Sequence, residues 1–265
     1  MNLDNRLAGT VTIVTGGGSG IGRGACERIA AEGGAVTVAD IRLEPAEEVA
    51  AAIRAEGGQA LAVACDVADE TQVAAMVAAT VDEFGSLTGL VANAGTVGNG
   101  WVHETAVEDW HFVLGVNLTG PFLCCKHALP HMMQARRGSI VMTSSIAGSV
   151  AGGGGSAASY SVSKAGVIAL ARQIAVDYGD WGIRANAIQP GAVANSTLAA
   201  HAVEDRAKLI SPAGEPMKRP KPWIPLRRAG KALDDYGATI AFLLSDDAGY
   251  ITGAQLPVEG GYLST

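Results

Sequence analysis

The sequence SYSVSK, residues 159–164, places a phenol at Tyr160 and an ammonium at Lys164, four residues apart. On a helix these two positions are neighbours on one face. An ammonium about 5 Å from a phenol, at an effective dielectric near 20, stabilises the phenolate by roughly 3 kcal/mol and lowers its pKa by about two. Such a phenol can exchange the proton that interconversion of an alcohol and a ketone requires. The alternative is a packing or capping tyrosine beside a surface lysine.

A glycine-rich turn, TGGGSGIG at residues 15–22, lies between an apolar run and a helical pattern. Gly16, Gly20 and Gly22 permit a tight turn, the close approach of a pyrophosphate, and close packing of the helix on the strand. Phosphates would then lie at the positive end of the helix. In a chain with 35 glycines a purely structural turn is the alternative, but the position between strand and helix favours a dinucleotide site.

Asp40 ends the second apolar run, 18 residues after Gly22. A carboxylate at this position can accept hydrogen bonds from an adenosine ribose, and it repels a 2′-phosphate. Ser19 is neutral and Ile41 is apolar, so neither supplies a cation for that phosphate. Arg23 and Arg42 lie nearby and favour the opposite interpretation. We expect NAD rather than NADP.

The elements that position these residues follow from an alternation of short β-branched runs and alanine-rich helical patterns. The predicted strands are 10–15, 35–40, 60–66, 87–95, 138–145, 183–191 and 254–261, and the predicted helices are 20–32, 44–57, 69–85, 107–136 and 159–178. This order predicts right-handed βαβ units. We expect an α/β protein, a single-domain Rossmann fold over residues 1–265 with a doubly wound seven-stranded parallel sheet and helices on both faces. Residues 194–230 break the alternation and are expected to form a substrate loop.

Composition excludes several classes of protein. The 265 residues are 48% hydrophobic and 17% charged, which is typical of a globular domain. A net charge of −7 argues against nucleic-acid binding, and the basic cluster Lys218–Lys221 is interpreted as a solvated loop first and an anion contact second. The four cysteines have no metal-ligand spacing, so we expect free thiols and no metal. The absence of a signal-peptide pattern and of an apolar run near 20 residues predicts a cytoplasmic protein that does not enter membranes.

Several motifs in order resemble those of the short-chain dehydrogenase/reductase family. TGGGSGIG resembles that family's TGxxxGxG, and YSVSK its YxxxK. ANAG resembles NNAG, with Ala92 in place of the first Asn, and ITGAQLPVEGG resembles ITG…DGG, with Glu259 in place of Asp. The resemblance extends from Thr15 to Gly261, and the ordered set of motifs makes it specific.

The resemblance implies an NAD(P)-dependent short-chain alcohol dehydrogenase or ketoreductase. The implied catalytic residues are Asn117, Ser145, Tyr160 and Lys164. Besides Tyr160 and Lys164, the cofactor-binding residues would be Gly16, Ser19, Gly20, Ile21, Gly22, Asp40, Asp66, Val67, Asn93, Gly95, Pro190, Gly191, Val193 and Asn195. Asp66 and Val67 would contact adenine, and Pro190 to Val193 the nicotinamide. A homotetramer joined through helices 107–136 and 159–179 and the C-terminal strand is also implied.

Three of these assignments have rivals. Ser144 competes with Ser145 for the substrate oxygen. Asn117, in GVNLTGP, is implied to break the helix and free a carbonyl for a water that gives Lys164 a proton path, and the alternative is a satisfied helix asparagine. Asn195 stands where the family usually has a Thr that bonds the carboxamide, and Ser196 or Thr197 can substitute.

Apolar side chains dominate the positions predicted to face the reacting carbon. They are Val97, Trp101, Ile146, Val150, Val193, Leu198, Met217 and Trp223. No carboxylate-binding arginine stands out among them, so we expect a hydrophobic secondary alcohol or diol, cyclic ones included, and its ketone as substrates. The alternatives are a non-catalytic NAD-binding sensor, which would be expected to lose Tyr160 or Lys164, and a 3-oxoacyl-thioester reductase, for which the acidic surface is unfavourable.

Overall fold

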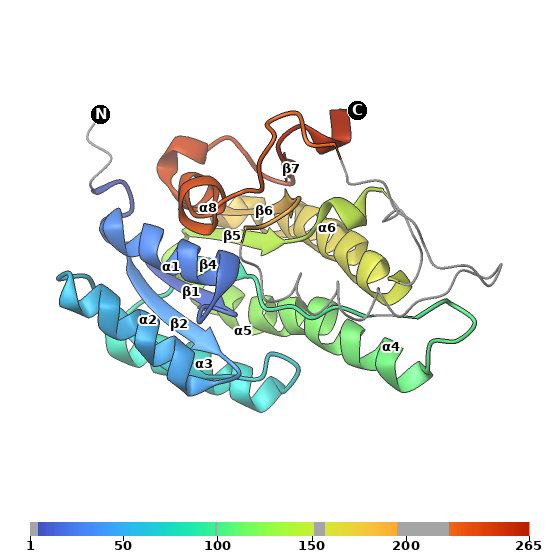
Figure 1. Cartoon of the computed structure of the whole chain (residues 1–265). Helices are drawn as coiled ribbons and strands as arrows, with labels where there is room; N and C mark the ends of the chain where they lie inside the picture. The colour runs from blue at the N-terminus through green and yellow to red at the C-terminus, as the bar shows by residue number, and fades with distance from the viewer. Residues whose placement is uncertain (1–4, 99, 151–156, 195–222, 265) are drawn as a thin grey trace.

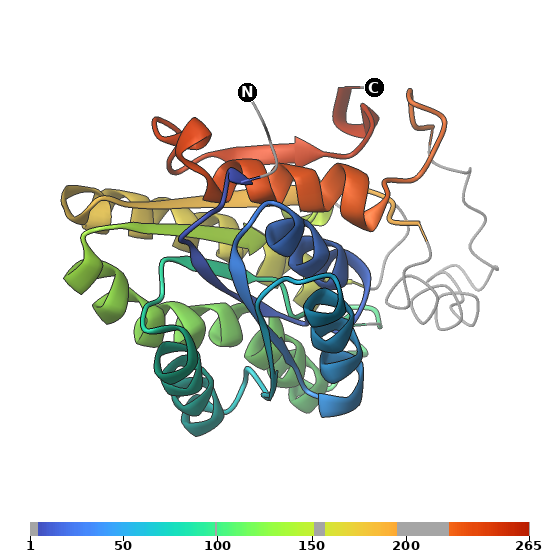
Figure 2. The same ribbon diagram turned by 90° about the vertical axis from the view of Figure 1, so that its left-hand side faces the viewer.

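A computed structural model describes residues 5–98, 100–150, 157–194 and 223–264. Seven strands form one parallel sheet, as predicted, and the structure gives their order as β3-β2-β1-β4-β5-β6-β7. The strands are β1 (Val11–Thr15), β2 (Ala35–Asp40), β3 (Ala60–Ala64), β4 (Gly89–Ala92), β5 (Gly138–Thr143), β6 (Ile183–Pro190) and β7 (Gln255–Val258). Strand β7, drawn in red, pairs with β6 at one edge of the sheet, and β3 forms the other edge (Figure 2).

Helices cover both faces of this sheet (Figure 1). The α-helices are α1 (Gly20–Ala31), α2 (Leu43–Ala55), α3 (Glu70–Phe84), α4 (Val107–Leu114), α5 (Gly120–Ala135), α6 (Ala158–Tyr178) and α8 (Ala238–Leu244). Short turns are η2 (Gly115–Thr119), η3 (Ile146–Gly148), η4 (Gly179–Trp181), η5 (Ala232–Gly237), η6 (Asp246–Ala248) and η7 (Tyr262–Ser264). One apolar core joins α3, α5 and α6 to the sheet, and a second joins α1, α2 and α8 to its other face.

The strand order explains where a ligand can bind. Strands β1, β4 and β5 are buried along their whole length, since their apolar runs face helices on both sides. From β1 the chain proceeds outward to β2 and β3, and then returns to β4 and proceeds the other way to β7. The carboxyl ends of β1 and β4 therefore flank the switch point at which open α/β sheets bind ligands.

The predicted long helix at 107–136 is interrupted. A π-helical turn, η2, separates α4 from α5 and contains Asn117. The run Val107–Ala135 is, by length and by its mean hydropathy of 1.2, the described helix that could cross a membrane. Half of its most apolar window is buried inside the protein, however, and Leu123, Ala128 and Met132 belong to the core. We interpret the run as a core helix of the domain.

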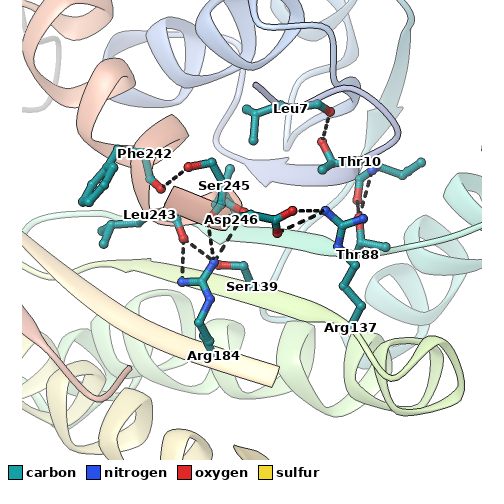
Figure 3. A network of polar contacts seen from close by, with 12 residues as sticks. Leu7, Thr10, Thr88, Arg137, Ser139, Arg184, Phe242, Leu243, Ser245 and Asp246 are labelled. Carbon is teal, nitrogen blue, oxygen red and sulfur yellow. Dashed lines mark hydrogen bonds and ion pairs between the residues drawn. The ribbon is translucent and has the colours of Figure 1, made fainter. Parts of the chain in front are cut away.

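At the amino ends of the strands, a polar network ties the sheet to α8 (Figure 3). The Arg184 guanidinium donates to the carbonyl oxygens of Leu243 at 2.8 Å and Ser245 at 3.0 Å, and at longer range to two more. The Ser139 hydroxyl donates to the same Leu243 carbonyl at 2.9 Å. Orphan carbonyls at the end of a helix need such donors, so this network terminates α8 on β5 and β6.

Candidate active site

Lys164 lies at the centre of the candidate site. Its ammonium is 5.8 Å from the centroid of the Tyr160 ring, and the side chain is 4% exposed. The i, i+4 spacing on α6 brings the two groups together as the sequence predicted. Burial lowers the pKa of Lys164 from its ordinary value of 10.5 to about 8. Among the described residues Lys164 Nζ donates a hydrogen bond to the Thr143 carbonyl at 2.8 Å, which leaves two of its N–H groups for a ligand.

Ser144 and Ser145 follow β5 but have different surroundings. The Ser144 hydroxyl donates to the Lys164 carbonyl oxygen at 2.7 Å and is buried against α6. The Ser145 hydroxyl oxygen accepts from the Ala147 amide at 3.1 Å, and within the described ranges no acceptor takes its proton. Gly148 permits this close packing, because a Cβ there would lie 2.8 Å from the Lys164 carbonyl oxygen. The geometry favours Ser145 over its neighbour as the group that meets a substrate.

Asn117 is fully buried and joins three parts of the site. Its amide oxygen accepts from the Thr96 amide at 2.7 Å, and its Nδ2 donates to the Thr96 carbonyl at 2.9 Å and to the Ser163 hydroxyl at 3.1 Å. The helix is locally broken at Asn117, as the sequence predicted, but its side chain is fully engaged with protein groups. A Cβ on Gly95 would lie 3.4 Å from both Asn117 Oδ1 and Lys164 Nζ, so these two groups converge beside Gly95.

The glycine turn at residues 15–22 forms a cradle, a backbone loop that side chains in place of its glycines would obstruct. Gly16 and Gly20 have φ of +64° and +52°, which favours glycine at both positions. A Cβ on Gly22 would lie 2.0 Å from the Gly16 carbonyl oxygen, so the first turn of α1 packs directly on the loop. A Cβ on Gly20 would have no neighbour within 4 Å, so the loop is open at that position. Ser19 is exposed and Ile21 is half-buried beside it. This arrangement fits a pyrophosphate at the N-terminus of α1.

Asp40 lies beside that cradle at the end of β2. Its carboxylate accepts from the Gly18 amide at 3.1 Å and from the Arg42 amide at 3.2 Å. Arg23 donates to Glu27 at 2.8 Å and to Glu48 at 2.9 Å, and these carboxylates raise its pKa. Arg23 is therefore neutralised by two acids, which weakens its case as a receptor for a 2′-phosphate.

The remaining residues predicted on the adenosine side follow the carboxyl ends of β3 and β4. Asn93 follows β4 and donates through Nδ2 to the carbonyl oxygens of Thr15 at 3.0 Å and Gly16 at 3.3 Å, so it ties β4 to the glycine turn. The Asp66 carboxylate accepts from the Ala68 amide at 2.9 Å in the turn after β3. Val67 is buried beneath it. These contacts are with protein groups, and the direct adenosine contacts stay predictions.

Residues 190–194 leave the sheet toward the predicted substrate loop. Pro190 is buried, and the Gly191 amide donates to the Val258 carbonyl at 3.2 Å. Val193 pairs with Gly230, and the Ala194 amide donates to the Gly230 carbonyl at 2.9 Å. The two ends of the segment between these residues are thus held together. Asn195, Ser196, Thr197, Leu198, Met217 and Lys218–Lys221 lie outside the described residues.

The predicted pocket residues occupy two kinds of position. Val97, Trp101 and Ile146 are half-buried, and Ile146 directly follows Ser145. Val150 is 40% exposed and Trp223 is 51% exposed, with the Arg227 guanidinium 5.2 Å from the Trp223 ring centroid. That these side chains face one substrate stays a prediction.

Some residues that shape the site were not anticipated from the sequence. The Thr15 hydroxyl accepts from the amides of Asn93 and Ala94 at 3.0 and 3.1 Å, and the Ser163 hydroxyl donates to the Tyr160 carbonyl at 2.7 Å. Gln189 is fully buried and donates to the Ser145 carbonyl. A polar residue between two apolar ones at the end of a predicted strand was the available signal for Gln189.

Two cavities in the described part of the chain lie away from these residues. One of about 60 Å³ lies at the amino edge of the sheet beside Thr12, Arg137 and Arg184. A second, more open one of about 310 Å³ is lined by Gly9, Gly33 and Phe84. The titratable groups, the glycine cradle and the switch point of the sheet all lie at the opposite, carboxyl edge, which we therefore regard as the chemical site.

Comparisons with known proteins agree with this geometry. Residues 16–263 match the family described as "Enoyl-(Acyl carrier protein) reductase". The chain is 43% identical over 257 residues to cis-4-hydroxycyclohexanecarboxylate dehydrogenase of Sinomonas cyclohexanicum, covering 97% of each chain. It is 37% identical over 258 residues to 2,5-dichloro-2,5-cyclohexadiene-1,4-diol dehydrogenase of Sphingobium indicum, covering 97% of this chain and 98% of the relative. The crystal structure of an NAD⁺-bound xylitol dehydrogenase superposes with a TM-score of 0.86 at 32% identity, covering 96% of this chain and 99% of that one.

Proposed function

The chain belongs to the short-chain dehydrogenase/reductase family, and on this premise we propose that it is an NAD-dependent alcohol dehydrogenase. Its substrates would be hydrophobic secondary alcohols or diols, cyclic ones in particular, and the corresponding ketones. Tyr160 would act as the general acid or base. The observation that carries the proposal is the buried Lys164 ammonium, 5.8 Å from the Tyr160 ring centroid beside a glycine cradle.

Each catalytic residue has a distinct task in this account. A bound nicotinamide dinucleotide would supply the hydride acceptor, or the hydride donor in the reverse direction. In the oxidative direction the Tyr160 phenolate takes the proton of the substrate hydroxyl, and in the reductive direction the Tyr160 phenol returns it. The Ser145 hydroxyl donates a hydrogen bond to the substrate oxygen and holds it against Tyr160.

Lys164 and Asn117 would support Tyr160. A cation held in a buried site interacts strongly with a phenolate, because little water screens it. The side chain of Asn117 fixes α6 through Ser163, next to Lys164 in the sequence, and fixes the segment after β4 through Thr96. The free N–H groups of Lys164 would hold the ribose hydroxyls or a water that carries the proton away.

NAD is proposed over NADP on electrostatic grounds. The Asp40 carboxylate lies against Gly18 in the cradle, where it would accept the adenosine ribose hydroxyls and repel a 2′-phosphate. Arg23, which could have compensated, is paired with Glu27 and Glu48. Gly16, Gly20 and Gly22 would hold the pyrophosphate, and Pro190 to Val193 the nicotinamide.

The class of substrate is supported by the relatives and by the composition of the pocket. Two of the three dehydrogenases compared above are named for substrates with a six-membered ring bearing a hydroxyl group, and the third is named for the open-chain polyol xylitol. Ile146 directly follows Ser145, and Val97 and Trp101 are predicted to line the same pocket; apolar side chains of this kind favour a hydrocarbon ring over a small charged acid. The substrate-loop residues 194–230 would complete the enclosure.

We also propose a cytoplasmic homotetramer. Four free, buried cysteines are typical of a reducing compartment. Exposed apolar side chains on the helices predicted to join subunits, Phe112 on α4, Phe122 on α5 and Val162 on α6, are from 47 to 62% exposed in the single chain. Surfaces of this kind mark contacts between proteins. Sedimentation of the purified chain would test the assembly.

A substrate panel tests the proposed activity. The purified chain is incubated with NAD⁺ or NADP⁺ and with cyclohexanols, cyclic diols, acyclic secondary alcohols and hydroxy acids, and the reduced cofactor is measured by its absorbance. We expect the highest kcat/KM for ring alcohols with NAD⁺. Tight NAD⁺ binding without turnover of any alcohol would instead indicate a sensor, and preferred reduction of 3-oxoacyl thioesters with NADPH would indicate a thioester reductase.

A further inference from the structure

A buried glutamine at the end of β6 lies directly behind Ser145. Gln189 is fully buried in a strand whose neighbouring side chains are mostly apolar. Its Nε2 donates to the Ser145 carbonyl at 2.9 Å and to the Ser149 hydroxyl at 2.8 Å, and its Oε1 accepts from Gln255 Nε2 at 2.7 Å. Both donors and the acceptor of the amide are thus engaged. A buried amide is costly unless it is satisfied in this way.

The partners of Gln189 are the two ends of one turn. Ser145 and Ser149 flank the 3-10 turn η3, and Ile146, a predicted pocket residue, lies between them. Gln255 on β7 donates a second short hydrogen bond to the Ser149 hydroxyl, and Arg172 on α6 donates to Gln255 Oε1 at 3.0 Å. The turn is therefore held by side chains from β6 and β7 as well as by its own backbone, and Arg172 of α6 in turn holds Gln255.

The orientation of the Ser145 hydroxyl depends on the turn that Gln189 holds through the Ser145 carbonyl. The Ser145 carbonyl accepts from the Gly148 amide at 2.9 Å and from Gln189, which uses both of its lone pairs. The Ser145 hydroxyl oxygen accepts from the Ala147 amide at 3.1 Å, so the orientation of the hydroxyl depends on the path of the same turn. A side chain without an N–H at position 189 would leave the carbonyl short of one donor and the turn free to shift.

We propose that Gln189 is a positioning residue that fixes the Ser145 hydroxyl for reaction by holding both ends of its turn. The proposal rests on the proposed function of Ser145 and extends it to a residue that does not touch the substrate. Gln255 and Ser149 are hydrogen-bond partners of Gln189, and their replacement should lower kcat less than replacement of Gln189 does. The role is expressed in the chemical step, since a shift of about 1 Å in a reacting group can cost 10²-fold in rate.

Gln189→Met tests the proposal, because it keeps the length of the side chain and removes its hydrogen bonds. We expect kcat with a ring alcohol to fall by about 10- to 100-fold, with KM and the Kd for NAD⁺ within about twofold of wild type. Ser149→Ala, which removes one partner, is expected to lower kcat by about two- to fivefold. Thermal unfolding of each variant shows whether the measured protein is folded.

Asn186→Leu is the matched control. Asn186 is a fully buried amide on the same strand, but it donates to the Ile251 carbonyl at 2.9 Å and accepts from the Ala254 amide at 3.0 Å, away from Ser145. A purely structural role for Gln189 would make the two variants alike, with a lower Tm and unchanged kcat for both. We expect the kcat loss in Gln189→Met alone, and equal kcat values in the two variants would overturn the proposal.

The outcome separates this proposal from the proposed function. If wild type is active and Gln189→Met retains its kcat, the positioning role is wrong and the dehydrogenase assignment stands. If wild type oxidises no alcohol, the dehydrogenase assignment fails, and crystal structures of both forms decide the positioning. A displaced Ser145 hydroxyl in Gln189→Met supports the role, and an unmoved one overturns it.

Discussion

A half-buried cation, Arg184, lies at the amino ends of the strands and a buried cation, Lys164, lies at their carboxyl ends, and the two have different hydrogen-bond partners. At the amino edge Arg184 donates to carbonyl oxygens of Leu243, Leu244, Ser245 and Ile251, so its donors are spent on the end of α8 and the turn after it (Figure 3). At the carboxyl edge Lys164 is more deeply buried and donates to the Thr143 carbonyl among the described residues. Arg184 thus stabilises the fold, whereas Lys164 makes fewer hydrogen bonds with the described residues and lies beside the Tyr160 ring.

This contrast separates stability from function. Burial lowers the pKa of both cations, but a guanidinium stays protonated at any pH a protein meets. The Lys164 ammonium titrates near pH 8 and has donors left for a ligand. Sites prepared for chemistry commonly hold groups whose pKa values are displaced by burial, at a cost in stability. The same substitution, to Met, can be made at both positions and should have opposite consequences.

Lys164→Met is expected to have the largest effect. Removing the cation deprives Tyr160 of the charge that stabilises its phenolate, so kcat for alcohol oxidation should fall by at least about 10³-fold. Steady-state kinetics with NAD⁺ and the best alcohol measures this loss. Turnover within tenfold of wild type would show that Lys164 does not activate Tyr160.

The same variant should have a higher free energy of unfolding than wild type at neutral pH. Because burial lowers the pKa of Lys164 to about 8, the charged lysine costs the folded state about 3 kcal/mol at neutral pH. The variant recovers this free energy but loses about 1 kcal/mol, because the Thr143 carbonyl is left without its donor. Between pH 8 and 10.5 the unfolded wild type binds more protons than the folded one, so wild type gains stability as pH rises. Urea unfolding at pH 7 and 10 should therefore show the advantage of Lys164→Met shrinking. A variant less stable than wild type at pH 7 would contradict the burial argument.

Arg184→Met should destabilise the fold and spare the chemistry. Partly buried carbonyls at the end of α8 would lose their donor, at an expected cost of about 2 kcal/mol in the free energy of unfolding. The folded fraction should keep the wild-type kcat, because Arg184 lies at the opposite edge from Tyr160. Arg54→Met, which removes an exposed ion pair with Glu47 and an exposed hydrogen bond to the Ala60 carbonyl, serves as the control and should cost about 1 kcal/mol or less. A large loss of kcat in Arg184→Met would contradict the assignment of Arg184 to stability alone.

Asp40→Ala should have the smallest effect of the four and alters the choice of cofactor. Loss of a charged acceptor for the ribose hydroxyls is expected to reduce the ratio of kcat/KM for NAD⁺ over NADP⁺ by about tenfold, or roughly 1.4 kcal/mol. Glu44→Ala, which removes an exposed carboxylate in the first turn of α2, should leave the ratio unchanged. An unaltered ratio in Asp40→Ala would mean that another residue reads the ribose.

The sequence was sufficient for the order of the strands and of the helices as far as α6, because most strands of this parallel sheet are short apolar runs between clear helical patterns, but α8 was not among the predicted helices. It also identified Tyr160 and Lys164 as neighbours, since that contact is local to one helix. The break at Asn117 could be predicted from the poor helix formers around it, although its π-helical form could not.

Contacts between distant segments could not be predicted from one sequence. The preference for Ser145 over Ser144 depends on which hydroxyl meets the α6 backbone, and that follows from packing rather than from sequence spacing. The pairing of Arg23 with Glu48 joins α1 to α2 in the same way. The role proposed for Gln189 needs β6, β7 and η3 in place before it becomes visible.

Replacement of Tyr160 by phenylalanine tests the central claim most directly, because it removes a single oxygen from the pair. Turnover of the best ring alcohol and the Kd for NAD⁺ are measured on wild type and on Tyr160→Phe. The account predicts a loss of kcat of at least about 10³-fold, with NAD⁺ binding within about twofold of wild type. Turnover close to that of wild type would contradict it.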